Sequence, residues 1–134
     1  MKSYIMKSDL IAEARRYVRN ANDTLEKNAK VDETNLRYQD PKYVRAAGHY
    51  LWHAVLMALD AVFEVRKDRR SRVNIDDYQR VVGKRDKKLL SWLNSSYNVL
   101  HLYMGYDGEL LKTISDEGVR LANDIIDRCA AMRK

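Results

Sequence analysis

The chain has 134 residues, of which 46% are apolar and 33% are charged, with one proline, five glycines and one cysteine. A chain of this length can bury enough apolar surface to fold without disulfides, and the composition excludes disordered, collagen-like and low-complexity proteins. We expect one domain over residues 1–134. There is no apolar run of roughly 18 residues, no signal-peptide pattern and no partner for Cys129 in an internal disulfide. We therefore expect a cytoplasmic protein without a membrane segment.

In four stretches of the chain, apolar residues recur three and four positions apart, which is the spacing of a helix with one buried face. The first stretch predicts a helix over about 8–28, with Ser8 as its N-cap. The second predicts a helix over about 40–68, in which Asp40 is the N-cap and Pro41 occupies the first turn. Because this second helix is apolar around most of its girth, we expect it to be central. The polar residues 29–39 form the connection.

The third stretch predicts a helical region over about 75–104, with Asn74 as its N-cap. A glycine inside a helix costs about 1 kcal/mol relative to alanine, so we expect a kink or break near Gly83. A turn at 105–108 leads to a fourth helix over about 109–132. Within that helix Gly118 predicts the close approach of an aromatic side chain from the second or third helix. Short connections between the four helices favour an antiparallel up-down bundle.

The net charge of +6 is concentrated in residues 66–88, which hold ten Lys or Arg residues against four Asp. In the rest of the chain, positive and negative residues are equal in number. A partner that binds through charge is therefore expected at this segment. The candidate contact residues are Arg66, Lys67, Arg69, Arg70, Arg72, Lys84, Arg85, Lys87 and Lys88. A protein that binds single-stranded nucleic acid by base stacking needs aromatic residues among the basic ones. In this segment only Tyr78 is so placed. The alternative is a solvated helix end, where basic residues complement the helix dipole.

Three histidines are candidate metal ligands. His49 and His53 lie four residues apart on one face of the second helix, followed by Asp60, and His101 lies on the third helix. Imidazoles and a carboxylate converging inside a bundle suit Zn or Fe. The spacing lacks the glutamate of a zinc-protease helix. The alternative is a structural hydrogen-bond network, with buried hydroxyls as partners. The tyrosines expected in that network are Tyr43, Tyr50, Tyr97, Tyr103 and Tyr106. Cys129 falls on an inward stripe, where a thiol is buried and inert.

Two sequence motifs carry a resemblance to a known protein family. The first is 47–54 (AGHYLWHA), and the second is 94–102 (NSSYNVLHL), followed by 105–108 (GYDG), Glu117, Gly118, Ala122, Ile125 and Ile126. With them the chain resembles a small bacterial family of helical-bundle proteins described as a domain of unknown function. The resemblance covers nearly the whole chain, and it implies the fold without implying an activity.

In architecture the chain is also similar to HEPN-type bundles and to the substrate-binding partners of minimal nucleotidyltransferases. HEPN ribonucleases use an arginine, then a polar residue, with four to six residues in all before a histidine. Here the nearest match is Arg45 to His49, with three residues between them and Ala46 at the polar position. This departure argues against ribonuclease activity, and a shared fold does not fix a function.

The sequence therefore predicts an all-α four-helix bundle that acts as a non-enzymatic binding module without a cofactor. Its basic segment would contact an anionic partner, either a protein or a nucleic acid, and the chain could form a homodimer. One alternative is a HEPN-like nucleotide- or RNA-related component acting with a nucleotidyltransferase. The other is a metal-binding bundle that uses His49, His53 and His101.

Overall fold

The protein is mainly helical. The computed structural model describes residues 7–65 and 73–133. Its elements in chain order are α1 (Lys7–Thr24), the π-helical segment η1 (Leu25–Ala29), β1 (Val31–Asp32), β2 (Arg37–Tyr38), α2 (Pro41–Asp60), α3 (Ile75–Arg85), α4 (Lys87–Ser96), the π-helical segment η2 (Tyr97–Tyr106) and α5 (Lys112–Met132). None of the helices in the described ranges is long and apolar enough to cross a membrane.

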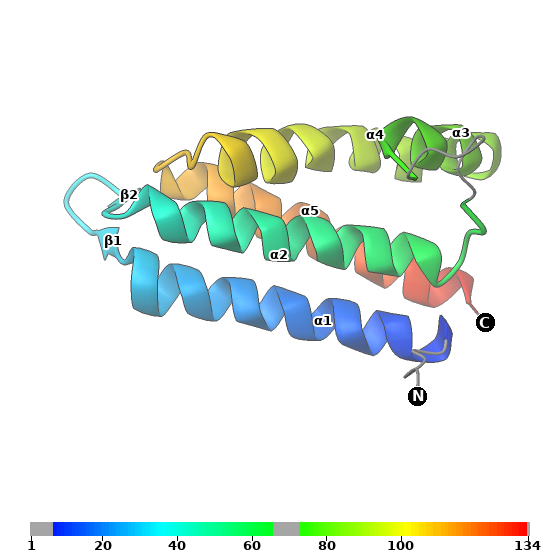
Figure 1. The fold of residues 1–134 in the computed structure, drawn as a ribbon, viewed down its shortest axis with the longest axis horizontal. Helices are drawn as coiled ribbons and strands as arrows, with labels where there is room; N and C mark the ends of the chain where they lie inside the picture. Colours follow the sequence, from blue (N-terminus) through cyan, green and yellow to red (C-terminus); the bar gives the residue numbers. More distant parts are fainter. Residues whose placement is uncertain (1–6, 66–72, 134) are drawn as a thin grey trace.

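The long helices lie side by side with their axes roughly parallel (Figure 1). Helix α2 contacts α1, α5 and η2, which confirms that it is the central helix. Its inward residues Leu51, Val55 and Leu59 are fully buried, together with Leu93 and Ile125 from the neighbouring elements. The core therefore runs along α2, and each of the other helices contributes one apolar face to it.

Two of the three predicted N-terminal caps, Asp40 and Asn74, are present, whereas the prediction of Ser8 as a cap is wrong because α1 already includes Lys7 and Ser8 lies inside it. The Asp40 carboxylate accepts a hydrogen bond from the Lys42 amide (3.0 Å) at the start of α2. At the start of α3, Asn74 and Asp77 form a reciprocal capping box with bonds of 2.9 and 3.2 Å. These contacts join residues two or three positions apart, so the local sequence is enough to specify them.

Helix α2 ends at Asp60, earlier than the predicted end near 68. The amides of Val62 and Phe63 both donate to the Leu59 carbonyl oxygen, which closes the last turn. The chain then leaves the helix axis, and the Phe63 side chain is buried at 4% exposure. The helix thus ends at Asp60, although the apolar pattern continues to Val65.

The interruption of the third helical region lies at Asp86 instead of Gly83. Asp86 has extended backbone angles, its amide closes α3, and its carboxylate caps α4 by accepting from the Leu89 amide (3.0 Å). Gly83 stays helical, and a Cβ built on it would lie 3.0 Å from Leu90 Cδ2. The glycine therefore makes room for a side chain of α4 and does not break the helix.

The connection and the last helix also differ from expectation. Strands β1 and β2 pair antiparallel within the predicted connection. The Tyr38 amide donates to the Leu110 carbonyl oxygen (2.8 Å), and the Lys112 amide donates to the Leu36 carbonyl oxygen (3.0 Å). Because residues 110–112 pair with this hairpin, α5 begins at Lys112 and not near 109. The side chains facing Gly118 are those of Val99, Leu100 and Met104, so the predicted aromatic neighbour is wrong.

Candidate functional site

Four basic side chains gather where α3 meets α4, and we call them the basic corner: Lys84, Arg85, Lys87 and Lys88. All four are exposed. The Arg85 guanidinium carbon lies 5.3 Å from the centroid of the Phe63 ring, and Lys88 Nζ lies 5.2 Å from the centroid of the Trp92 ring. Within residues 7–65 and 73–133, none of the four has a carboxylate partner. Their charges therefore face solvent.

The acidic residue inside this corner is already neutralised. Asp86 accepts two hydrogen bonds from the Arg128 guanidinium, at 2.8 and 3.1 Å. These bonds hold the pKa of the Asp86 carboxyl below its usual value. Arg128 also lies over the Trp92 ring, 5.7 Å from its centroid. Because the charges of Asp86 and Arg128 cancel each other, the four positive charges of the basic corner remain.

Several charged pairs elsewhere in the described part of the chain join residues three or four positions apart. Arg16 pairs with Glu13, Lys112 with Asp116, and Arg120 with both Glu117 and Asp124. The remaining residues of the predicted basic site, Arg66, Lys67, Arg69, Arg70 and Arg72, lie outside the described residues.

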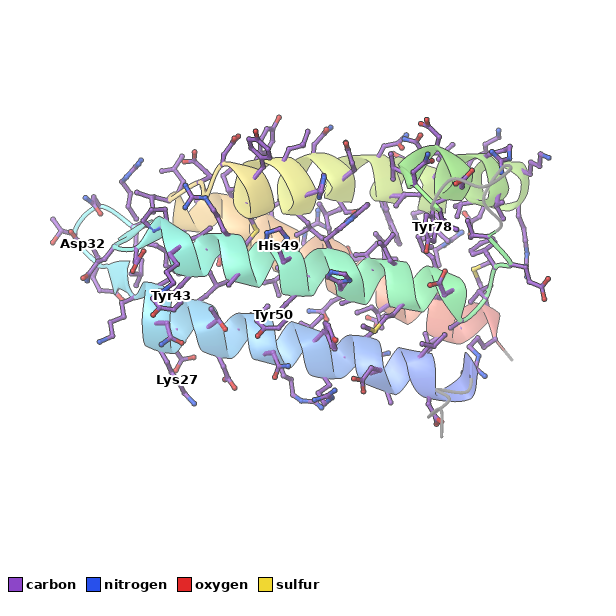
Figure 2. All side chains as sticks on the ribbon, viewed as in Figure 1. Lys27, Asp32, Tyr43, His49, Tyr50 and Tyr78 are labelled. Carbon is purple, nitrogen blue, oxygen red and sulfur yellow. The ribbon has the colours of Figure 1, made fainter. Side chains whose placement is uncertain are left out.

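The three histidines do not converge. His49 is exposed on α2 (Figure 2), and its Nδ1 lies 3.7 Å from the position of a Cβ built on Gly105. The ring centroid of His53, also exposed, lies 6.4 Å from that of Tyr17 on α1. His101 packs against Trp52 and Tyr97. No group of three or more His, Cys, Asp or Glu side chains in the described part of the chain could hold a metal ion.

The hydrogen bond between helices that was expected of a Tyr-His-Asp network comes from another tyrosine. Tyr78 of α3, labelled in Figure 2, donates to Asp60 of α2 at 2.9 Å. Burial, and then the charge of Asp60, raise the pKa of Tyr78 well above its usual value, so the hydroxyl stays protonated. Tyr103 and Tyr106, expected inside, are 45% and 76% exposed. Sequence spacing could not have found this pair, because eighteen residues and a change of direction separate the two side chains.

Sequence reasoning also missed an aromatic pocket of about 310 Å³ between α2, η2 and the start of α3. Its walls are formed by Trp52, Leu56, Val73, Asn74, Ile75, Tyr78, Tyr97 and His101. The apolar spacing of each helix marks these residues only as inward or half-buried. That they share one cavity depends on how three separate elements pack.

A larger cavity of about 670 Å³ lies between the end of α1, the hairpin and α5. Its walls include Glu26, Lys30, Glu33, Lys112 and Asp116, so both signs of charge are present. The Lys112 ammonium donates to both Asp116 oxygens, at 3.0 and 2.9 Å, and these bonds raise the pKa of Lys112. This lysine is therefore already bound to a carboxylate of the chain.

Cys129 is fully buried in α5. Burial raises the pKa of its thiol to about 12. A catalytic thiol needs a lowered pKa, so Cys129 is a packing residue.

Together these features define a class: a small, mainly helical protein with an aromatic pocket and with a basic corner that has no carboxylate partner among the described residues. The chain belongs to the family described as a domain of unknown function (DUF5618), which matches residues 9–131. Among solved structures, it is similar to a protein of unknown function from Dyadobacter fermentans, with 36% sequence identity and a TM-score of 0.85. That similarity covers 93% of this chain and 97% of the other. No curated protein matches the chain.

Proposed function

We propose that this protein is a non-enzymatic binding module whose basic corner contacts an anionic partner. The observation that carries the proposal is the set of four exposed positive charges that have no carboxylate partner within residues 7–65 and 73–133. Like charges held close together repel each other in the free protein. A partner bearing carboxylates or phosphates would relieve that repulsion and gain attraction in the same contact.

The helix dipole accounts for only half of this corner. Lys84 and Arg85 lie in the last turn of α3, where positive charge is favourable. Lys87 and Lys88 are the first two residues of α4, where the helix dipole disfavours positive charge. A basic cluster that only complemented helix ends would not include these two lysines. Their position supports a role in contacting another molecule.

The partner is expected to be recognised through charge more than through base stacking. Tyr78, the aromatic residue predicted among the charges, is 7% exposed and hydrogen-bonded to Asp60. The Trp92 ring lies near both Lys88 and Arg128. Single-strand binding proteins present open aromatic faces to successive bases. The corner therefore suits the carboxylates of an acidic protein or the phosphates of a duplex.

We infer that the scaffold is an antiparallel four-helix bundle in which the run from α3 to η2 serves as one interrupted helix. The side-by-side arrangement of this run with α1, α2 and α5 supports the inference (Figure 1). The cytoplasmic location and the formation of a homodimer, both expected from the sequence, remain predictions.

The HEPN-like alternative, in which the chain acts with a nucleotidyltransferase, has less support. The Arg45 Nε–H donates to the Tyr106 carbonyl oxygen at 3.3 Å, so this arginine joins α2 to the end of η2. A nucleotidyltransferase encoded beside this protein would favour the alternative.

The test compares two variants that remove the same charge from opposite ends of the molecule. The first replaces the basic corner with serines: Lys84→Ser, Arg85→Ser, Lys87→Ser and Lys88→Ser. The control replaces four exposed basic residues at the hairpin end that also lack a carboxylate partner in the described chain: Lys27→Ser, Lys30→Ser, Arg37→Ser and Lys42→Ser. Both sets contain three lysines and one arginine.

Binding is measured as the salt concentration that elutes each protein from heparin, duplex RNA and polyglutamate. We expect the corner variant to elute at clearly lower salt than the control, because attraction to a polyanion depends on how many charges meet it. Retention on polyglutamate but not on RNA would indicate an acidic protein partner. Equal elution of the two variants would refute the proposal, since total charge alone would then explain retention.

A further inference from the structure

The aromatic pocket beside η2 has the size and walls of a small-molecule site. Its volume of about 310 Å³ is near the lower limit of ligand pockets, which span roughly 300–1,000 Å³. None of the residues lining it belongs to the basic corner. A ligand here would be small and would bind independently of the proposed anionic partner.

Three rings form one wall of this pocket. The Tyr97 and His101 ring centroids lie 5.1 Å apart with 30° between the ring planes. Trp52 lies 5.7 Å from Tyr97 and 5.8 Å from His101. These separations are those of offset or edge-to-face aromatic contacts. A flat ring entering the pocket could extend the same stack.

One polar atom in this cluster has no partner. His101 Nδ1 is closed off from solvent and makes no hydrogen bond within the described chain. Buried polar side-chain atoms are nearly always paired, so an unpaired one calls for a group outside the chain. The imidazole turns about its Cβ–Cγ bond between broadly distributed orientations. Such a turn would bring this nitrogen to a ligand that offers an N–H group.

Two of the rings come from an unusual backbone. Tyr97 and His101 belong to η2, a π-helical segment of ten residues. Such segments are rare and normally last a single turn, and they occur frequently at functional sites. Regular α-helix would place these two rings differently relative to Trp52. The π-helical segment and the unpaired nitrogen therefore occur together, at the wall of the same cavity.

We propose that this pocket binds a small, uncharged heteroaromatic molecule that carries a ring N–H group. The ring would pack on Trp52, Tyr97 and His101, and the N–H group would donate to the free nitrogen of His101. None of the eight lining residues is an acid, a lysine or an arginine. A charged ligand would lose its hydration here without gaining a counter-charge from the described lining residues.

The experiment uses indole, which has a ring N–H, and benzothiophene, which has the same shape without it. Each is titrated into the full-length protein while NMR follows the indole N–H signal of Trp52 and the imidazole signals of His101. Trp92, outside the pocket, is the internal control. We expect indole to shift the pocket signals and to bind about tenfold more tightly than benzothiophene, which is the effect of one hydrogen bond.

The variant His101→Phe keeps a ring in the wall but removes the nitrogen. We expect it to bind indole and benzothiophene equally, with the Trp92 signal unchanged as evidence of an intact fold. The comparison of the two ligands on the unchanged protein needs no variant, so the proposal can be tested even if His101→Phe fails to fold. Pocket signals that do not move with indole, or equal affinity for both ligands, would overturn it. Binding of tetramethylammonium ion in place of indole would also overturn it and would indicate a cation site.

Discussion

Gly48 of α2 lies against the backbone of η2, and this contact gives the sharpest test of the packing. A Cβ built on Gly48 would lie 2.5 Å from the Gly105 nitrogen and 2.9 Å from its Cα. Both are backbone atoms, so no side-chain rotation relieves the clash. In Gly48→Ala, α2 and η2 must therefore move apart.

Gly83 provides a matched control, because it is also a buried helical glycine. A Cβ there would meet the end of the Leu90 side chain, at 3.0 Å from Cδ2. This flexible terminus can move. The same substitution, glycine to alanine, thus meets a rigid neighbour at one position and a mobile neighbour at the other.

The two substitutions are expected to change the free energy of unfolding in opposite directions. Alanine gains about 1 kcal/mol over glycine inside a helix, and overpacking costs about 1–3 kcal/mol. With contacts this short at Gly48 the cost falls in the upper part of that range, so Gly48→Ala should lower the free energy of unfolding by about 1–2 kcal/mol. Gly83→Ala should raise it by up to about 1 kcal/mol. The two free energies of unfolding should therefore differ by about 1–3 kcal/mol. At roughly 3–5 °C per kcal/mol for a chain of this size, the two Tm values should differ by about 3–15 °C.

Thermal and urea unfolding followed by far-UV circular dichroism measure both variants. Similar dependence on urea would show that each unfolds in one cooperative transition. If Gly48→Ala were as stable as the unchanged protein, or if both variants moved in the same direction, the close approach of α2 and η2 would be wrong.

Three further predictions concern single side chains. Because Arg128 lowers the pKa of Asp86 in the folded state, this pair stabilises the protein above about pH 4 and its contribution is lost as pH falls; Asp86→Asn should therefore lose less stability to acid than the unchanged protein, and an equal acid loss in urea titrations would contradict this. Cys129, with its pKa raised to about 12 by burial, should resist a chromogenic disulfide reagent at neutral pH until urea unfolds the chain; rapid labelling of the native protein would show that the thiol is accessible. Removing the 2.8 Å hydrogen bond between the Tyr38 and Ser115 hydroxyls through Tyr38→Phe should cost about 1 kcal/mol of unfolding free energy, and an unchanged urea midpoint would refute a stabilising role.

The basic corner was within reach of sequence reasoning, whereas the aromatic pocket was not. Charge is a property of composition, so the segment around Lys84 and Lys88 stands out before any fold is known. The pocket joins Trp52, Tyr78 and His101 from three different elements. Nothing in the spacing within one helix says which neighbour will face it.

The histidines show the same limit. Helical spacing correctly places His49 and His53 on one face of α2. It does not say that this face is exposed between two neighbouring elements, or that His101 will pack against Trp52 instead. Convergence of side chains is a property of helix packing, and the metal hypothesis depended on it.

The sequence by itself determined where the helices form and where α2 and α3 begin, because a helix start depends on side chains a few residues away. Asp40 bonds to an amide two residues on, and Asn74 to one three residues on. Tertiary structure decided where the elements stop and break. The break at Asp86 is held by Arg128, 42 residues further along the chain, and α5 begins only after residues 110–112 have paired with the hairpin. Those positions depend on contacts between distant segments, which exist only once the chain has folded.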